Sequence, residues 1–313
     1  RPGGCTHLND SVRARVQNWL VSRATLYTKE LLTDFERPPG VLRACAVVGD
    51  LLRQMGMLEK ALSLLNAGLQ DSRQAECTSE RAVLLARIGL IQTQQGDLDS
   101  ALSTLTEARD IQVATQMLET EEGANVLMRI GIVYRNQKRL EEALNHYQDA
   151  KRIRCATETV ETPDGALLLS NTGYVLYQHG DLDAALGSYR EAIRIRKTTN
   201  TLDTPDGALT LMGIGLVQQD RGDLVGALNN YTESERIRVA TRTLRSPYGA
   251  LLLCSFGQAY FLKGDLEHAL EKFEEARRIR VATGTLDTSD GALLLTRIDQ
   301  CLAAIEAHNL SMI

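Results

Sequence analysis

Apolar residues recur with a helical period through most of this 313-residue chain. Between residues 166 and 179 they fall at positions 166, 169, 173, 176 and 177, the spacing that places side chains on one face of an α-helix. Gly180-Asp181 interrupts the pattern, which resumes at 182, 185, 186, 189, 192, 193 and 195. The pattern predicts a pair of helices joined by a short turn.

The same pair recurs along the chain with a fixed period. A Gly-Ala step returns every 42 residues, at Gly123, Gly165, Gly207, Gly249 and Gly291. A second glycine lies eight residues after this position, at Gly131, Gly173, Gly215 and Gly257, and Gly89 lies eight residues after Arg81, which takes the place of the first glycine there. These second glycines suit places where two helix backbones approach closely. Such self-similarity indicates a repeat array. We expect an N-terminal segment, 1–37, with a long capping helix; an array, 38–307, of about six helix pairs and a terminal capping helix; and a tail, 308–313.

The repeats resemble a known family in residue order and spacing. The residues that carry the resemblance in one unit are Gly173, Leu176, Gly180, Leu182, Ala185, Tyr189, Ala192 and Ile193. This order is similar to the tetratricopeptide repeat, and the period of 42 rather than 34 resembles the long repeats of kinesin light chains. The resemblance implies an all-α fold, a right-handed α-solenoid of tandem helix-turn-helix repeats. It also implies that the first helices line a concave groove that holds peptide ligands.

A Thr-Pro-Asp-Gly string, as in residues 204–207, has the look of a ligand-binding loop. Its residues are explained by the start of a helix. Thr204 is a good N-cap, Pro205 suits the first helical position, and Asp206 complements the helix dipole. The string therefore predicts the junction between adjacent repeats.

The groove residues follow from the register of the repeats. Counted from the glycine of each first helix, the expected partner-binding side chains are Met128, Ile132, Arg135, Tyr174, Tyr177, Met212, Leu216, Gln219, Gln258 and Phe261, with Ser170 and Cys254 among them. This surface is apolar and aromatic toward its C-terminal half, which suits an apolar or helical partner segment. The alternative is that the solenoid's own curvature or its N-terminal helix covers these side chains.

Pairs of arginines end the second helices. The second member of each pair, Arg154, Arg196, Arg238 and Arg280, is a candidate for a basic edge that binds an acidic partner. The alternative is that it reaches the aspartate of the next loop. Acidic residues three positions before the first members, such as Glu191 before Arg194, predict pairs within the helix.

Composition and motifs argue against catalysis. No nucleophile elbow, phosphate loop or HExxH string occurs, and the six cysteines show no zinc-type spacing, so we expect no enzyme activity, no metal and no cofactor. A net charge of −5 does not favour a nucleic-acid partner, and no apolar run is long enough for a membrane span. The scattered cysteines favour reduced thiols.

The leading hypothesis is a scaffold or adaptor that binds a protein or peptide segment, with the chain as a subunit of a larger assembly. The alternative is the regulatory part of a longer enzyme or motor-associated chain, and helical-repeat RNA binding is a third reading. We expect a cytoplasmic protein, or an organellar one, because the sequence begins at Arg1 rather than at methionine.

Overall fold

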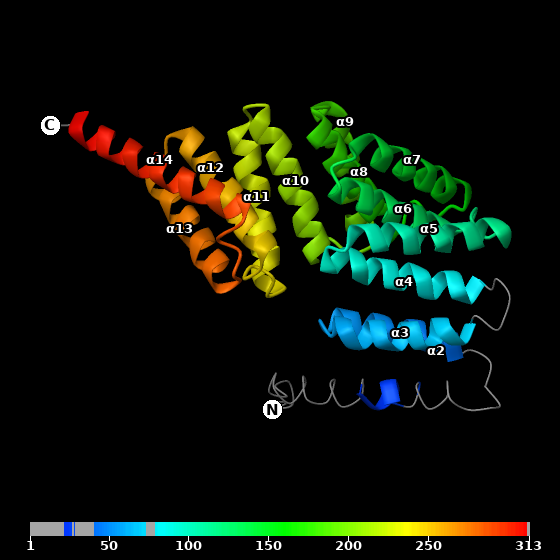
Figure 1. The fold of residues 1–313 in the computed structure, drawn as a ribbon. Helices are drawn as coiled ribbons and strands as arrows, with labels where there is room; N and C mark the ends of the chain where they lie inside the picture. The colour runs from blue at the N-terminus through cyan, green and yellow to red at the C-terminus, as the bar shows by residue number, and fades with distance from the viewer. Residues whose placement is uncertain (1–21, 27, 29–40, 73–78, 312–313) are drawn as a thin grey trace, which may run out of the picture. The chain divides into compact units, whose positions relative to one another are not determined.

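The computed structural model describes residues 22–26, 28, 41–72 and 79–311, and these residues are helical apart from short turns (Figure 1). The helices are α2 (Val41–Gln54), α3 (Leu58–Ser72), α4 (Ser79–Gln95), α5 (Leu98–Ala114), α6 (Glu121–Asn136), α7 (Leu140–Ala156), α8 (Pro163–His179), α9 (Leu182–Thr198), α10 (Pro205–Asp220), α11 (Leu224–Ala240), α12 (Pro247–Lys263), α13 (Leu266–Ala282) and α14 (Ser289–Ser311). The predicted all-α solenoid of tandem helix pairs is confirmed.

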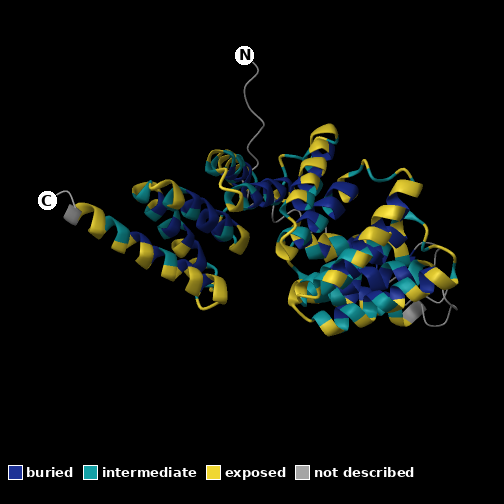
Figure 2. Cartoon of the chain, turned by 90° about the horizontal axis from the view of Figure 1, so that it is seen from above, coloured by how far each residue is buried: buried dark blue, intermediate teal, exposed yellow. Residues whose placement is uncertain are grey.

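The chain divides into two compact units, Arg1–Thr157 and Glu158–Ile313. In each unit the two helices of a pair pack against each other. The first helix of each pair also contacts the first helix of the next pair in that unit. Buried positions lie between these helices and exposed positions on their outer faces (Figure 2), and the buried side chains are mostly apolar. The core is thus a series of small clusters, several of which span a helix pair and the first helix of the next pair, as expected when each repeat contacts only its neighbours.

The glycine in the middle of each first helix permits this close packing. A Cβ atom on Gly257 would lie 2.7 Å from the Phe273 ring, and one on Gly89 would lie 2.6 Å from Leu105. Both distances are shorter than van der Waals contact, so the aromatic or leucine of the second helix requires glycine opposite it. The small-residue pattern of the sequence is therefore a packing pattern.

The Thr-Pro-Asp-Gly strings start helices, as predicted. Thr204 Oγ1 accepts a hydrogen bond from Gly207 N at 3.2 Å, and Pro205 is the first residue of α10. Ser246 and Thr288 cap α12 and α14 in the same way, at 3.2 and 3.3 Å. A Cβ atom on Gly207 would overlap the carbonyl oxygen of Leu202. The string is thus the capped start of a helix at the junction between repeats, as predicted.

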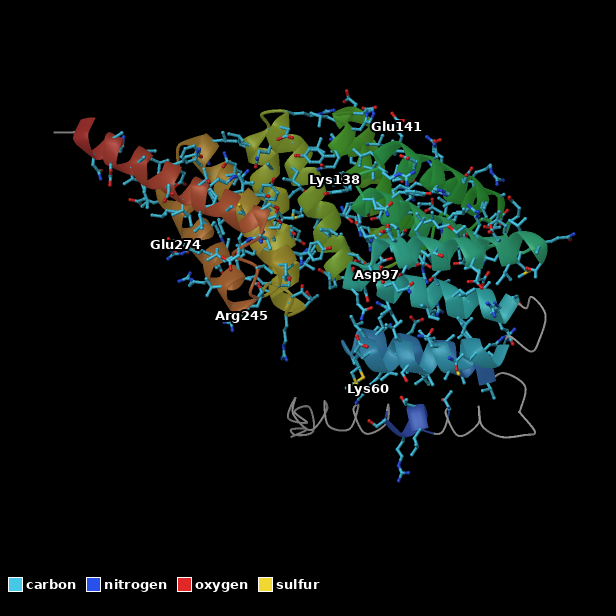
Figure 3. All side chains as sticks on the ribbon, in the orientation of Figure 1. Lys60, Asp97, Lys138, Glu141, Arg245 and Glu274 are labelled. Carbon is cyan, nitrogen blue, oxygen red and sulfur yellow. The ribbon has the colours of Figure 1, made fainter. Side chains whose placement is uncertain are left out.

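A second recurring geometry joins the two helices of a pair. Gly180, at the C-terminus of α8, has a left-handed backbone with φ of 89°, and Asp181 then caps α9 by accepting from Ala184 N at 3.0 Å. In the α6–α7 turn, Lys138 adopts the same left-handed conformation, with φ of 62°, and Arg139 supplies no capping hydrogen bond (Figure 3). The α6–α7 turn thus has the left-handed residue although it lacks the glycine and the capping aspartate of the α8–α9 turn.

The ends of the array lie partly outside the described residues. The predicted capping helix over 10–35 falls mainly there, and only residues 22–26 and 28 of it are described, as helical. At the other end α14 continues to Ser311, beyond the predicted boundary at 307. Four cysteines in the described part, Cys45, Cys155, Cys254 and Cys301, are free thiols.

Candidate partner-binding surfaces

The first helices of the second unit, α8, α10 and α12, lie next to one another, and α8 and α12 carry aromatic side chains that are incompletely covered. Tyr174 on α8 is 41% exposed. One turn later, the half-buried Tyr177 donates a hydrogen bond from its hydroxyl to Asp220 Oδ2 on α10, at 2.8 Å. Burial and this hydrogen bond raise the pKa of Tyr177 above its ordinary value, so the phenol stays neutral and fixed. These two rings form an ordered aromatic surface.

Residues of α10 and α12 extend that surface. Leu216 packs at the margin of a buried cluster, and Gln219 accepts a hydrogen bond from the Tyr231 hydroxyl at 3.3 Å. On α12, Gln258 and Phe261 are partly exposed. The predicted residues Tyr174, Tyr177, Leu216, Gln219, Gln258 and Phe261 therefore retain side-chain area that a partner can contact. In the first unit, Ile132 and Arg135 on α6 are partly exposed in the same way.

Two predicted groove residues are interior, and the prediction is wrong for them. Met128 and Met212 are each 4% exposed. Met212 belongs to a cluster with Leu252 and Phe256 of the neighbouring first helix, so that helix covers it. Ser170 and Cys254, at the equivalent offset, are buried as well. The position three residues before the glycine faces the adjacent repeat rather than solvent.

The predicted basic edge is also wrong. Arg154, Arg196, Arg238 and Arg280 are between 0 and 3% exposed, so they cannot form an exposed cationic edge. They lie beneath the junctions between repeats, where Arg280 Nη2 is 3.4 Å from Asp290 Oδ2, the contact expected under the alternative. The exposed arginines are the first members of each pair. Two of them, Arg194 and Arg236, are each paired with the glutamate three residues earlier, at 2.7 Å.

Comparison with known families agrees with this geometry. Residues 124–198 match the tetratricopeptide repeat model. Residues 124–198 of this chain therefore carry tetratricopeptide repeats. No curated protein sequence matches it.

Solved structures show similar folds. BtubC (BKLC) from P. vanneervenii is 21% identical with a TM-score of 0.61, over 73% of this chain and 92% of that protein. A kinesin-light-chain-type protein with nearly identical TPR-like repeats from Podosopora anserina is 16% identical with a TM-score of 0.52, over 66% and 99%. The APC/C hetero-tetramer Cut9–Hcn1 gives 15% and 0.67, over 90% of this chain and 46% of that one. At these identities the likeness concerns the fold.

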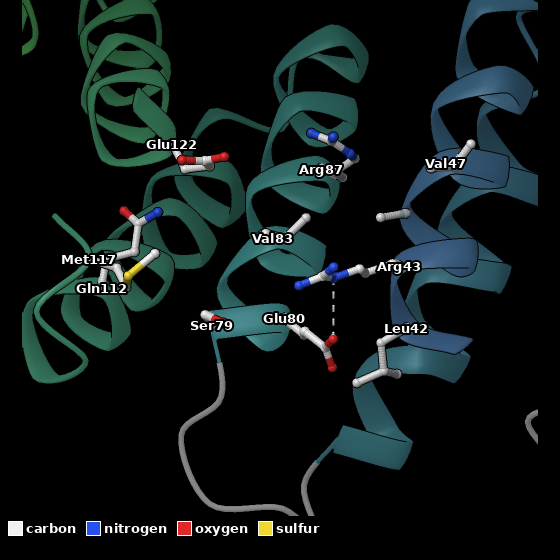
Figure 4. Close-up of a pocket in the computed structure, with 11 residues that line it drawn as sticks. Leu42, Arg43, Val47, Ser79, Glu80, Val83, Arg87, Gln112, Met117 and Glu122 are labelled. Atoms are coloured by element: carbon white, nitrogen blue, oxygen red, sulfur yellow. Dashed lines mark ion pairs between the residues drawn. The ribbon is translucent and has the colours of Figure 1, made fainter. Parts of the chain in front are cut away.

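The first unit contains a pocket that the sequence did not predict. It has a volume of about 450 Å³ and lies between α2, α4 and the α5–α6 junction (Figure 4). Val47 and Val83 line it, as do Gln112 and Met117. An ion pair between Arg43 and Glu80, at 3.5 Å, bounds one side. These residues precede Gly123, in a part of the chain where Arg81-Ala82 replaces Gly-Ala and where no partner-binding residue was predicted.

Two histidines of the described part occupy packing or capping positions. His146 stacks on Tyr134 with ring centroids 5.3 Å apart, and burial lowers its pKa. His268 Nδ1 lies 2.8 Å from Asp265 Oδ1 at the start of α13. Within the described ranges no group of histidine, cysteine or acidic side chains could hold a metal ion. Among the described helices, none has the length and apolar character needed to cross a bilayer.

Proposed function

We propose that this chain is a non-catalytic interaction scaffold that holds an apolar or helical segment of a partner protein on the first helices of its tetratricopeptide repeats, as a subunit of a larger assembly. The observation that carries the proposal is the aromatic surface of α8, α10 and α12. Tyr174, Tyr177 and Phe261 retain exposed ring area on helices of one unit, and Asp220 orders one of the rings. Rigid, partly exposed aromatic side chains are the typical anchors of protein interfaces.

The similarity to Cut9–Hcn1, a hetero-tetramer, supports an assembly role for a fold of this kind. The free thiols of the described part are compatible with the reducing cytoplasm, where we place the protein.

Site-specific photo-crosslinking tests the proposal in cells. A photoreactive phenylalanine analogue replaces Tyr174 or Phe261 and, as a control, Val239, which is 58% exposed on the second helix α11. We expect a discrete adduct from positions 174 and 261 and none from 239. Mass spectrometry then identifies the bound segment.

Binding of that segment to a variant checks the role of the aromatic residues. Replacing Tyr174, Tyr177 and Phe261 together with alanine should weaken binding on the order of 100-fold, because anchor residues commonly contribute more than about 1 kcal/mol each. The matched control replaces Val225, Val239 and Val281, which are exposed on second helices, and should leave affinity and helicity unchanged. Equal affinity of the aromatic triple variant and the unmodified protein would contradict the proposal.

A further inference from the structure

The junction that leads into α12 differs in charge from the equivalent junctions. Immediately before the N-cap, the loops into α6, α8, α10 and α14 carry an acid: Glu119, Glu161, Asp203 and Asp287. The loop into α12 carries Arg245 there (Figure 3). Two residues after the N-cap, the same four helices carry Glu122, Asp164, Asp206 and Asp290, whereas α12 carries Tyr248 and has no acid in its first turn. The junction into α12 thus has neither acid, and an arginine stands in place of the first one.

The structure shows what the first of these acids does elsewhere. Arg152 forms an ion pair with Glu119 at 2.7 Å. Arg194 contacts Glu161 and Arg236 contacts Asp203 in the same arrangement, 33 residues apart in sequence. The next arginine in the series is Arg278, and the residue 33 positions before it is Arg245. Two exposed arginines therefore occupy the places where the other repeats pair opposite charges, and within the described residues neither forms an ion pair.

A buried cation lies at the same junction. Arg238 is 3% exposed, its Nε has no hydrogen-bond acceptor, and it forms no ion pair within the described part of the chain. Burial lowers the pKa of Arg238, while Tyr248 and Asp206 act in the opposite direction. A guanidinium stays charged in proteins, so an unpaired buried one is unfavourable.

The aspartates of neighbouring junctions show where a carboxylate is missing. Asp206 acts electrostatically on both Arg196 and Arg238, and Asp290 contacts Arg280. One repeat after Asp206 the position is held by Tyr248, whose side chain is largely in solvent at 58% exposure. The carboxylate position that follows Arg238 is therefore vacant.

We propose that this junction, the basic junction of Arg238, Arg245, Tyr248 and Arg278, is a docking site for an acidic segment of a protein partner. One carboxylate pairs with Arg245 and Arg278 at the surface, and another reaches Arg238 beside Tyr248. Arginine favours such pairs because its planar fork binds carboxylates at two points.

Charge distribution favours an acidic protein segment over a nucleic acid. Asp203 in the preceding junction and Asp287 in the following one confine the excess of positive charge to a single junction. A nucleic acid needs a longer basic track to neutralise successive phosphates, and the net charge of the chain is −5. The site is also separate from the aromatic surface, because Tyr248 and Phe261 are 13 residues apart in α12, about 20 Å along the helix.

Fluorescence anisotropy at low salt tests the proposal with defined probes. The probes are a labelled eight-residue peptide of alternating glutamate and alanine, its glutamine counterpart, and single-stranded RNA of equal charge. We expect the glutamate peptide to bind and the glutamine peptide not to bind. Arg245→Glu should weaken binding at least tenfold and, by pairing with Arg278, raise the melting temperature by about 1–3 °C. The control Arg190→Glu makes the same charge change on an exposed residue of α9 and should change affinity less than twofold.

Each alternative outcome overturns the proposal. Equal losses in the two variants mean that only net charge matters, and tighter binding of RNA assigns the junction to nucleic acid. Absence of peptide binding leaves the basic junction as a structural irregularity. The test is independent of the aromatic surface, since the Tyr174, Tyr177 and Phe261 triple variant should bind the glutamate peptide normally.

Discussion

The junction into α6 and the junctions of the second unit have the same N-capping hydrogen bond but differ in one buried side chain. Gln112, at the end of α5, occupies the repeat position that Arg196, Arg238 and Arg280 hold at the ends of α9, α11 and α13. Gln112 is 3% exposed, its Oε1 has no donor, and it lines the 450 Å³ pocket. The shorter side chain accompanies open space where an arginine would extend. The backbone of the junction thus sets the period, and its buried side chain is free to change the local chemistry.

Substitution of the junction glycine, which both kinds of junction contain, should have the largest effect on stability. Gly207→Ala in the second unit and Gly123→Ala in the first should each destabilise the protein by about 2–3 kcal/mol, because the added Cβ atom overlaps the carbonyl oxygen of Leu202 or Leu118. Urea denaturation followed by circular dichroism measures the effect. Gly187→Ala is the control, since a Cβ atom there meets no atom within 4 Å, and it should stabilise by up to about 1 kcal/mol. A tolerated Gly207→Ala would show that the junction backbone adapts.

The buried arginines should differ from one another. Arg154 Nη2 donates to Asn125 Oδ1 at 2.5 Å, whereas Nε and Nη2 of Arg196 have no acceptor. Arg154→Met should therefore lower the free energy of unfolding by about 1–3 kcal/mol, because it removes the hydrogen-bond donor to Asn125 Oδ1. Arg196→Met should change that free energy by less than about 1 kcal/mol. Chemical denaturation of both variants checks the difference. Equal losses would mean that the arginines act through side-chain packing alone.

The two kinds of junction also show how far the sequence predicts the molecule. Helix pairs, N-caps and glycine contacts were predictable, since each depends on local residue types and a repeated spacing. The burial of Arg154 was not, because an arginine at a helix C-terminus suits the dipole whether it is exposed or covered. The depth of Met128 and Met212 depends on the rotation of neighbouring helices, which spacing alone does not set. The pocket was missed because it depends on side-chain length at Gln112.

Exchanging the side chain at Gln112 should convert one junction into the other. Gln112→Arg adds the longer side chain of the second unit next to Glu122, which also lines the pocket and could accept its hydrogen bonds. We expect a gain in stability of about 1 kcal/mol or less, since the arginine must be desolvated. Thermal denaturation measures the gain, and Gln112→Met separates filling of space from pairing with Glu122. If the methionine variant stabilises equally, charge pairing contributes nothing here.

The smallest expected effect is a dependence on pH that resides in the first unit. Burial lowers the pKa of His146, with Asp149 acting in the opposite direction and Arg109 in the same one. The unfolded chain, with a histidine pKa near 6.5, therefore binds a proton more readily than the folded protein. The contribution of His146 is complete above about pH 6.5 and is lost as the pH falls through the lowered pKa of the folded state. Between pH 7.5 and 5.5 the unmodified protein should lose more stability than His146→Gln, by less than about 1 kcal/mol in urea denaturation. Gln148→His adds an imidazole at an exposed position of the same helix and should not increase that loss. Parallel pH dependence of His146→Gln and the unmodified protein would place the titration elsewhere.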